Sequence, residues 1–347
     1  MTATDTLLSR YRNQNRRRAV IVVVMALLAA CAVLLDLTTG PAGLPLSETL
    51  KALTGGEVSR ATGVIIWNVR LPVALLALLV GAALALAGAE MQTVLENPLA
   101  EPFTLGVSSA AALGAATAIV LGVTVPFLPP VWGVSANAFI FAIGALGLLQ
   151  VMGRIRGGGP EILILFGIAL NFTAGAFLSL LQFVASADAL QQLVFWTMGS
   201  LSAASWTGLS VLALVLACTI PFSLKASWKL TALRLGEEQA RSFGVDVASL
   251  RRWALLRVSL LAASAVSLVG VIGFVGLAGP HIARMLVGED HRFFLPASLL
   301  TGALVMSLAS VASKLVVPGV LLPVGLVTSL IGLPIFFSLI LRGKGRK

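Results

Sequence analysis

Long apolar segments run through most of the chain and are separated by short clusters of Gly, Pro and charged residues. No Asp, Glu, Lys or Arg occurs from Phe103 to Gly153, and Asp188 is the single charged residue from Ile162 to Leu224. About 20 consecutive apolar residues are enough to cross a bilayer as a helix. We therefore predict an all-α, polytopic membrane protein with about ten transmembrane helices: Ala19–Leu37, Leu71–Leu95, Phe103–Val123, Val134–Met152, Ile162–Ala185, Trp206–Phe222, Trp253–Phe274, Val275–Val287, Phe294–Val316 and Val324–Leu341.

The overall composition agrees with this pattern. Of the 347 residues, 58% are hydrophobic and 11% are charged, and the mean hydropathy is +1.00. A soluble domain of this length needs more charged residues to cover its surface. The first apolar segment, Ala19–Leu35, is too long for the core of a typical signal peptide and has no clear small-residue cleavage site. We expect it to be retained as the first transmembrane helix.

Positive charge gathers at the chain ends and in a few loops. The formal net charge is +10, but this arrangement does not suit nucleic-acid binding, so we expect no nucleic-acid partner. Lys and Arg favour the cytoplasmic side of a membrane. We therefore expect a multi-pass membrane protein with both termini in the cytoplasm, although the loop Glu96–Glu101 has no positive charge. The residues that support this orientation are Arg10, Arg12, Arg16, Arg17, Arg18, Arg154, Arg156, Lys225, Lys229, Arg234, Arg241, Arg251, Arg252, Arg284, Arg292, Arg342, Lys344, Arg346 and Lys347. The opposite loops hold chiefly Lys51, Arg60, Arg70 and Lys314.

Groups that could perform chemistry are sparse. Two cysteines and two histidines have no metal-site spacing, and no Walker loop is present, so we expect no metal, no cofactor and no nucleotide bound by this chain. The predicted helices offer no catalytic pair, and few ionisable groups that would couple transport to an ion gradient. Besides scattered Ser and Thr, the uncharged polar residues in or next to these helices are Asn68, Gln92, Asn137, Gln150, Asn171 and Gln182, and a lone Asn or Gln there more often forms an interhelical hydrogen bond than a ligand contact. For Asn171 a second interpretation, that it lines the transport path, stays open.

A stripe of small residues recurs every four positions at Gly106, Ala110, Gly114 and Ala118. Such a stripe lets a neighbouring helix approach closely. We expect a helix-packing surface here, with a lining of the transport path as the alternative.

The segment Ala232–Leu250 follows the sixth predicted helix on the expected cytoplasmic side. Leu235, Ala240, Phe243 and Val247 are spaced for one helical face, and glycines interrupt the segment. A short amphipathic helix of this kind suits a groove on a partner protein. The alternative is a helix that lies on the lipid headgroups.

Several blocks of sequence in a fixed order resemble the permeases of the ABC transporters that take up iron-siderophores, haem and cobalamin, the FecCD type. They are RLPVALLALLVGAALALAGAEMQ (Arg70–Gln92), ENPLAEPFTLGVSS (Glu96–Ser109), FWTMGSLSAASW (Phe195–Trp206), LGEEQARSFGV (Leu235–Val245), IGFVGLAGPHIAR (Ile272–Arg284), GEDHR (Gly288–Arg292) and LPVGLVTSLIGLP (Leu322–Pro334).

The resemblance implies a type II ABC importer permease of the bacterial inner membrane that pairs with a second permease, as a homodimer or heterodimer. It also implies two separate ATP-binding cassette subunits that hydrolyse ATP, so the chain itself is not an enzyme, and a periplasmic or lipid-anchored substrate-binding protein. Residues 1–18 and 342–347 are then basic cytoplasmic tails of a permease domain at 19–341, which has a coupling loop at about 223–252. The residues implied to contact the ATPase are Leu235, Gly236, Glu237, Glu238, Gln239, Ala240, Arg241 and Gly244.

The resemblance also implies that Arg70 and Lys314 bind acidic side chains of the substrate-binding protein. The family often has a second Arg three residues after the first, where this chain has Val73, and Lys51 or Arg60 could compensate for its loss. The substrate expected first is an iron-siderophore complex, with haem or cobalamin as alternatives. An ion-coupled secondary transporter and an intramembrane enzyme are the hypotheses from other classes.

Overall fold

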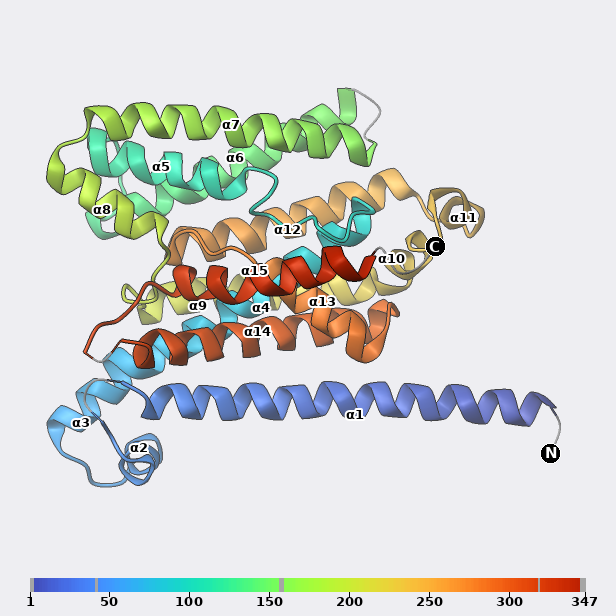
Figure 1. The fold of residues 1–347 in the computed structure, drawn as a ribbon, viewed down its shortest axis with the longest axis horizontal. Helices are drawn as coiled ribbons and strands as arrows, with labels where there is room; N and C mark the ends of the chain where they lie inside the picture. The colour runs from blue at the N-terminus through green and yellow to red at the C-terminus, as the bar shows by residue number, and fades with distance from the viewer. Residues whose placement is uncertain (1–2, 41–42, 156–158, 318, 344–347) are drawn as a thin grey trace.

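The structure is a computed structural model that describes residues 3–40, 43–155, 159–317 and 319–343. The described residues form helices that are joined by loops, with no strand among them (Figure 1). Its elements are α1 (Ala3–Thr38), α2 (Leu46–Leu53), α3 (Arg60–Val64), a π-helical segment η1 (Ile65–Arg70), α4 (Leu71–Val94), α5 (Val107–Leu121), a 3₁₀ turn η2 (Pro130–Trp132), α6 (Gly133–Ile155), α7 (Pro160–Val184), α8 (Ala187–Thr197), α9 (Trp206–Lys225), α10 (Ser227–Leu233), α11 (Glu237–Ser242), α12 (Val247–Val269), α13 (Val275–Val287), α14 (His291–Leu315) and α15 (Val324–Gly343).

The predicted membrane fold is confirmed. In the described part of the chain, seven helical segments are long and apolar enough to cross a membrane, and three shorter apolar helices accompany them. The shorter ones lie in α5, α13 and α15, at the third, eighth and tenth predicted positions. The sequence did not predict α2, α3 or α8, which are short helices between the spans.

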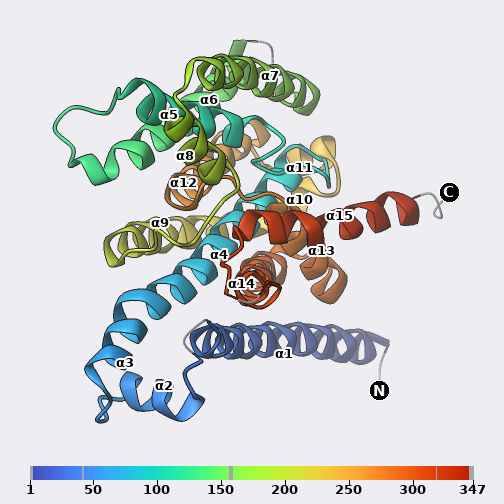
Figure 2. The ribbon, with the colours of Figure 1, turned by 60° about the vertical axis from the view of Figure 1, so that its left-hand side comes forward.

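Helix α4 forms the centre of the bundle. It packs against α14, α12, α13 and α9, and almost all of its side chains are buried (Figures 1 and 2). A helix that is apolar on all sides is expected to be buried in this way. Close packing depends on paired glycines: a Cβ on Gly81 would overlap the Gly302 carbonyl of α14, and one on Gly88 would overlap the Gly276 carbonyl of α13.

A second group of helices, α5 to α8, lies on the side of α12 away from α14 and α1 (Figure 1). The small-residue stripe lies inside this group. A Cβ on Gly106 would lie 2.8 Å from the Asn171 backbone nitrogen of α7, and one on Gly114 would lie 2.5 Å from the Asn137 carbonyl of α6. The stripe therefore packs α5 against its neighbours, as the packing interpretation expected.

The connection between α12 and α13 is not helical. Residues 270–274 leave the helix at Gly270, whose φ is +76°, and Phe274 precedes α13 with a φ of +67°. The buried carboxylate of Glu101 lies at the start of α13 and accepts a hydrogen bond from the Phe274 amide at 3.4 Å. A negative charge at a helix N-terminus is favourable because the free amides and the helix dipole point at it.

Two expectations fall partly outside the described residues. Arg156 and residues 344–347 of the second basic tail belong to the parts that the structure does not describe. The first basic tail, residues 1–18, is described from Ala3 onward as the beginning of α1, which continues without a break into the first apolar segment.

Candidate coupling and docking sites

One end of the bundle brings together the start of α1, the short helices α10 and α11, and the loop 288–290 (Figure 1). We call it the α11 end. Here Gly236 (φ +112°) and Gly244 (φ +80°) enclose α11, as the sequence predicted from its glycines. Positive φ values are accessible to glycine at little cost, so both turns can be tight. The result is a single short helix that lies beyond the end of α12 (Figure 1).

The apolar residues of this segment do not form one face, which corrects the sequence interpretation. Ala240 and Val247 are buried, with 0% and 2% of their surface exposed, whereas Leu235 is 61% and Phe243 is 59% exposed. Glu238 and Gln239 are also exposed. The physical reason is that the two turns reverse the chain on both sides of α11, so a helical period does not continue across them. The exposed side chains form a mixed apolar and polar surface, which we call the α11 surface.

Arg251 of α12 ties α11 to the centre of the bundle. Its Nε donates to the Val94 carbonyl at the end of α4 at 3.0 Å, and its Nη2 lies 3.3 Å from a Glu237 carboxylate oxygen. Glu96 lies 3.9 Å from the same Nη2. Glu237 is also paired with Arg241 one turn later. Arg251 of α12 therefore joins α11 to the end of α4 through charge-assisted hydrogen bonds, of which the one to Glu237 is partly buried.

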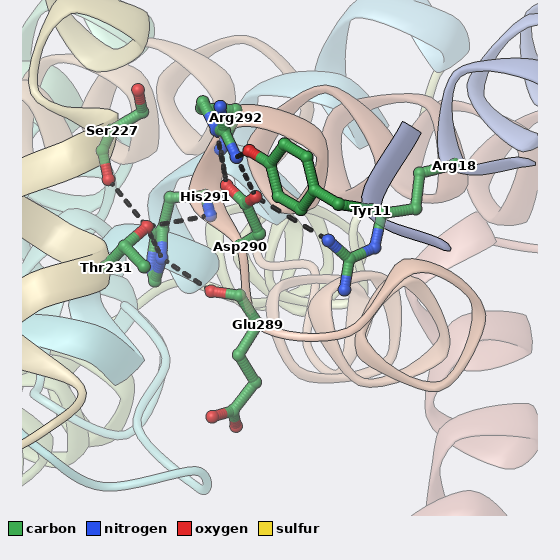
Figure 3. A network of polar contacts seen from close by, with 8 residues as sticks. All are labelled: Tyr11, Arg18, Ser227, Thr231, Glu289, Asp290, His291 and Arg292. Carbon is green, nitrogen blue, oxygen red and sulfur yellow. Dashed lines mark hydrogen bonds and ion pairs between the residues drawn. The ribbon is translucent and has the colours of Figure 1, made fainter. Parts of the chain in front are cut away.

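A second polar network at the α11 end is centred on His291, the first residue of α14 (Figure 3). Its Nε2 is 2.8 Å from the Thr93 hydroxyl of α4, and its Nδ1 is 3.0 Å from the Glu289 carbonyl. Its amide donates to the Thr231 hydroxyl of α10 at 3.0 Å. Three helices thus meet at one buried side chain. Sequence analysis missed this role because the histidine lies in no metal or catalytic pattern.

Next to this histidine, Asp290 joins α14 to α1. It accepts from the amide of Arg292 at 3.1 Å and lies 3.6 Å from the Arg18 guanidinium (Figure 3). The hydrogen bond from the Arg292 side chain lowers the pKa of Asp290 below its usual value. The Tyr11 hydroxyl of α1 accepts a hydrogen bond from Nη2 of Arg292 at 3.1 Å. These contacts fix the basic first turns of α1 against the bundle.

Buried ion pairs inside the bundle correct the expectation that ionisable groups are sparse there. Glu90 of α4 is fully buried, and Arg257 of α12 donates its Nε to both carboxylate oxygens at 3.0 Å. Asp36 of α1 is equally buried and accepts from the Lys314 ammonium of α14 at 2.7 Å. Charges can persist at such depth because each one has a partner. Neither pair could be recognised from sequence, since the partners are far apart along the chain.

The opposite end of the bundle, near α2, α3 and α8, contains the two residues expected to dock the substrate-binding protein. Arg70 and Lys314 line one cavity of about 330 Å³, together with Ser200 and Ser202. Both side chains are largely buried, since Arg70 is 5% exposed and the Lys314 side chain 9%. Arg70 donates from Nη1 to the Leu37 carbonyl at 2.7 Å, while its Nη2 has no partner among the described residues. The docking role stays a prediction.

Of the other residues named from sequence, Asn171, Gln92 and Asn137 form hydrogen bonds inside the bundle. Asn171 accepts a hydrogen bond from the Ser109 hydroxyl, which joins α7 to α5. Its role in lining a path stays a prediction. Gln92 bonds the Arg284 side chain at 3.0 Å, and Asn137 bonds the Val123 carbonyl at 2.7 Å. Lys51 and Arg60 are exposed on the short helices of the opposite end.

Comparison with known proteins gives a consistent result. The model of the FecCD transport family matches residues 18–342. The chain is 37% identical to the hemin transport system permease protein HmuU of Yersinia pestis, over 91% of this chain and 95% of that protein. It is 34% identical to the vitamin B12 import system permease protein BtuC of Klebsiella pneumoniae, over 99% of both chains.

Solved structures agree with this result. The fold matches that of a metal-chelate type ABC transporter in an inward-facing conformation, with a TM-score of 0.81, 32% identity, and coverage of 93% of this chain and 99% of that one. The family model spans nearly the whole chain, and the two permeases are similar over nine tenths of it or more. The chain therefore belongs to the FecCD transport family and is a multi-pass membrane permease of an ABC importer.

Proposed function

We propose that this chain moves an iron-siderophore complex from the periplasm to the cytoplasm across the bacterial inner membrane. It would do so beside a second permease, with two ATP-binding cassette subunits at the α11 end and a substrate-binding protein at the opposite end. ATP binding and hydrolysis in the cassette subunits would shift the permeases between two conformations. One conformation would bind the nucleotide-bound cassettes better, and the other would bind the nucleotide-free cassettes better.

The observation that carries this proposal is the combination of an exposed and a buried side on α11. Leu235 and Phe243, which flank α11, offer apolar contacts at the α11 end, and the partly exposed Glu237 is held by Arg251. A partner that binds the α11 surface would push on a helix that is fixed to α4 and α12. This is the arrangement that a mechanical coupling element requires.

The placement of the ATPase at this end rests on charge. Exposed arginines of the first turns of α1, together with those of α11 and α12, gather at the α11 end. Because basic residues remain on the cytoplasmic side, this end would face the cytoplasm. An intracellular ATPase would then reach the α11 surface directly.

The substrate assignment is the finer part of the proposal. It is supported by the likeness to a metal-chelate type transporter. Haem is a second candidate because a hemin permease is 37% identical, and cobalamin is a third because a vitamin B12 permease is 34% identical.

Purification and uptake assays test both the ATP-driven mechanism and the substrate assignment. The full chain, isolated from its native membrane in mild detergent, should bring down an ATPase and a second permease subunit. After reconstitution into proteoliposomes with a loaded substrate-binding protein, uptake should require ATP and stop with vanadate. A panel of ferric siderophores, haem and cobalamin then identifies the substrate. Uptake without any ATPase would overturn the mechanism, whereas ATP-driven uptake of haem or cobalamin alone would overturn only the siderophore assignment.

A further inference from the structure

A groove of about 510 Å³ lies between the end of α9, the start of α10 and the first half of α12. Its wall is apolar and comes from membrane-spanning helices: Phe222 of α9, and Trp253, Leu256 and Leu260 of α12. Its rim holds Lys225, the last residue of α9, and Lys229 of α10. Apolar and cationic surfaces therefore meet at the level where a transmembrane helix ends.

The charge at this rim is not neutralised by the protein. Within the described residues, neither Lys225 nor Lys229 takes part in an ion pair. Asp246 also lines the groove, but its carboxylate caps α12 by accepting from the Ser249 amide at 2.9 Å. Arg257 at the back of the groove is paired with Glu90. The rim therefore has two ammonium groups and one carboxylate, and this excess of positive charge favours an anionic ligand.

We propose that this groove binds an anionic phospholipid. The phosphate would lie between Lys225 and Lys229, which both line the groove. An acyl chain would follow the wall formed by Phe222 and Leu256. Basic pockets between transmembrane helices bind anionic headgroups for this reason, and exposed Trp is enriched at the same depth. A free anion would use the lysines but leave the apolar wall without a ligand.

The position of the groove gives the bound lipid a consequence. α10 and α12 enclose it, and the α11 surface lies on the chain between these two helices. A lipid in the groove would hold α10 at a fixed distance from α12 and so support α11 from the membrane side. The inference does not depend on which substrate the importer carries.

Cys218 provides a reporter inside the groove. It lines the groove and is exposed, and replacing the other cysteine by Cys31→Ser leaves it as the only thiol. The purified full chain is placed in detergent micelles that contain phosphatidylglycerol or phosphatidylcholine, and the rate of Cys218 alkylation by N-ethylmaleimide is measured. Phosphatidylglycerol should protect Cys218 at low mole fraction, and phosphatidylcholine should not. In Lys225→Gln/Lys229→Gln the concentration for half protection should rise roughly 30-fold, because each lysine near a membrane surface contributes to anionic lipid binding.

Two further variants make the result specific. Lys225→Arg/Lys229→Arg should keep the protection, because the charge remains. Arg12→Gln/Arg16→Gln removes the same charge from exposed positions of α1 at the same end, and should also keep it. Equal protection by both lipids, protection that survives loss of the lysines, or no protection at all would overturn the proposal. Protection by glycerol phosphate alone would replace the lipid by a soluble anion and would also overturn it.

Discussion

The guanidinium of Arg257 on α12 binds the carboxylate of Glu90 on α4, with its Nε 3.0 Å from both oxygens. The two residues are 167 positions apart and both are buried. Because α4 is the centre of the bundle, this pair fixes the register between α12 and the core. The same two helices are also joined by the hydrogen bond from Arg251 to the Val94 carbonyl.

Replacing Glu90 by Gln should destabilise the protein strongly. The substitution leaves the Arg257 charge buried without a counter-charge, which typically costs about 3–5 kcal/mol. The measurement is thermal unfolding of the purified permease in detergent, where we expect a clear fall in the midpoint. Glu90→Met/Arg257→Met removes both charges and should recover most of the loss. If the single variant is as stable as the parent protein, the pair does not hold the helices together.

Charge reversal on α11 should uncouple transport. In Glu237→Arg/Glu238→Arg/Arg241→Glu the pair between positions 237 and 241 can re-form with opposite polarity, but the arginine introduced at position 237 faces Arg251. The repulsion should release α11 from α12, so substrate uptake should fall at least tenfold while membrane insertion stays normal. ATPase binding and uptake in proteoliposomes are the measurements.

Charge reversal at two exposed positions of the opposite end is the matched control for the ATPase-binding measurement, because Lys51, a candidate for docking, lies at the end away from α11. Glu48→Lys/Lys51→Glu on α2 exchanges two exposed charges without touching α11, and ATPase binding should remain normal. Normal uptake by the triple variant would remove the coupling role of these residues.

Arg70→Glu/Lys314→Glu should slow capture of the loaded substrate-binding protein. Arg70 still has one free donor in the cavity, and opposite charges increase association rates about 10-fold or more at low salt. Association rates at several salt concentrations measure the effect. Lys314 is already paired with Asp36, so Asp36→Asn/Lys314→Gln separates the loss of that ion pair from a loss of docking. A rate that is unchanged and independent of salt would contradict the docking role.

Hydropathy located the transmembrane helices well because length and apolar content decide whether a segment enters a bilayer. The eighth predicted span, Val275–Val287, has the same limits in the structure. The short helix α8 escaped prediction because Asp188 and two glutamines break its apolar pattern. Helices this short depend on tertiary contacts rather than on local sequence.

The site could be predicted only where its features are local. The glycines at 236 and 244 indicated where α11 begins and ends, because positive φ values are a property of single residues. By contrast, Glu90, Asp36 and His291 depend on partners that folding brings from distant segments. The α11 surface was mistaken for a continuous helical face for the same reason: the turns on both sides redirect Leu235 and Phe243.

Gly88→Ala should destabilise the bundle, although Ala is the better helix former. A Cβ at this position would overlap the Gly276 carbonyl of α13, and the nearest atoms are all backbone atoms of that packed helix. Such overpacking typically costs about 1–3 kcal/mol, occasionally more. Gly175→Ala on α7 is the matched control, since no heavy atom lies within 4 Å of the added methyl group and only the gain in helix propensity remains. Thermal unfolding in detergent should therefore lower the midpoint for Gly88→Ala and leave it unchanged or slightly higher for Gly175→Ala. The same shift in both variants would mean that the approach of α4 to α13 does not limit stability.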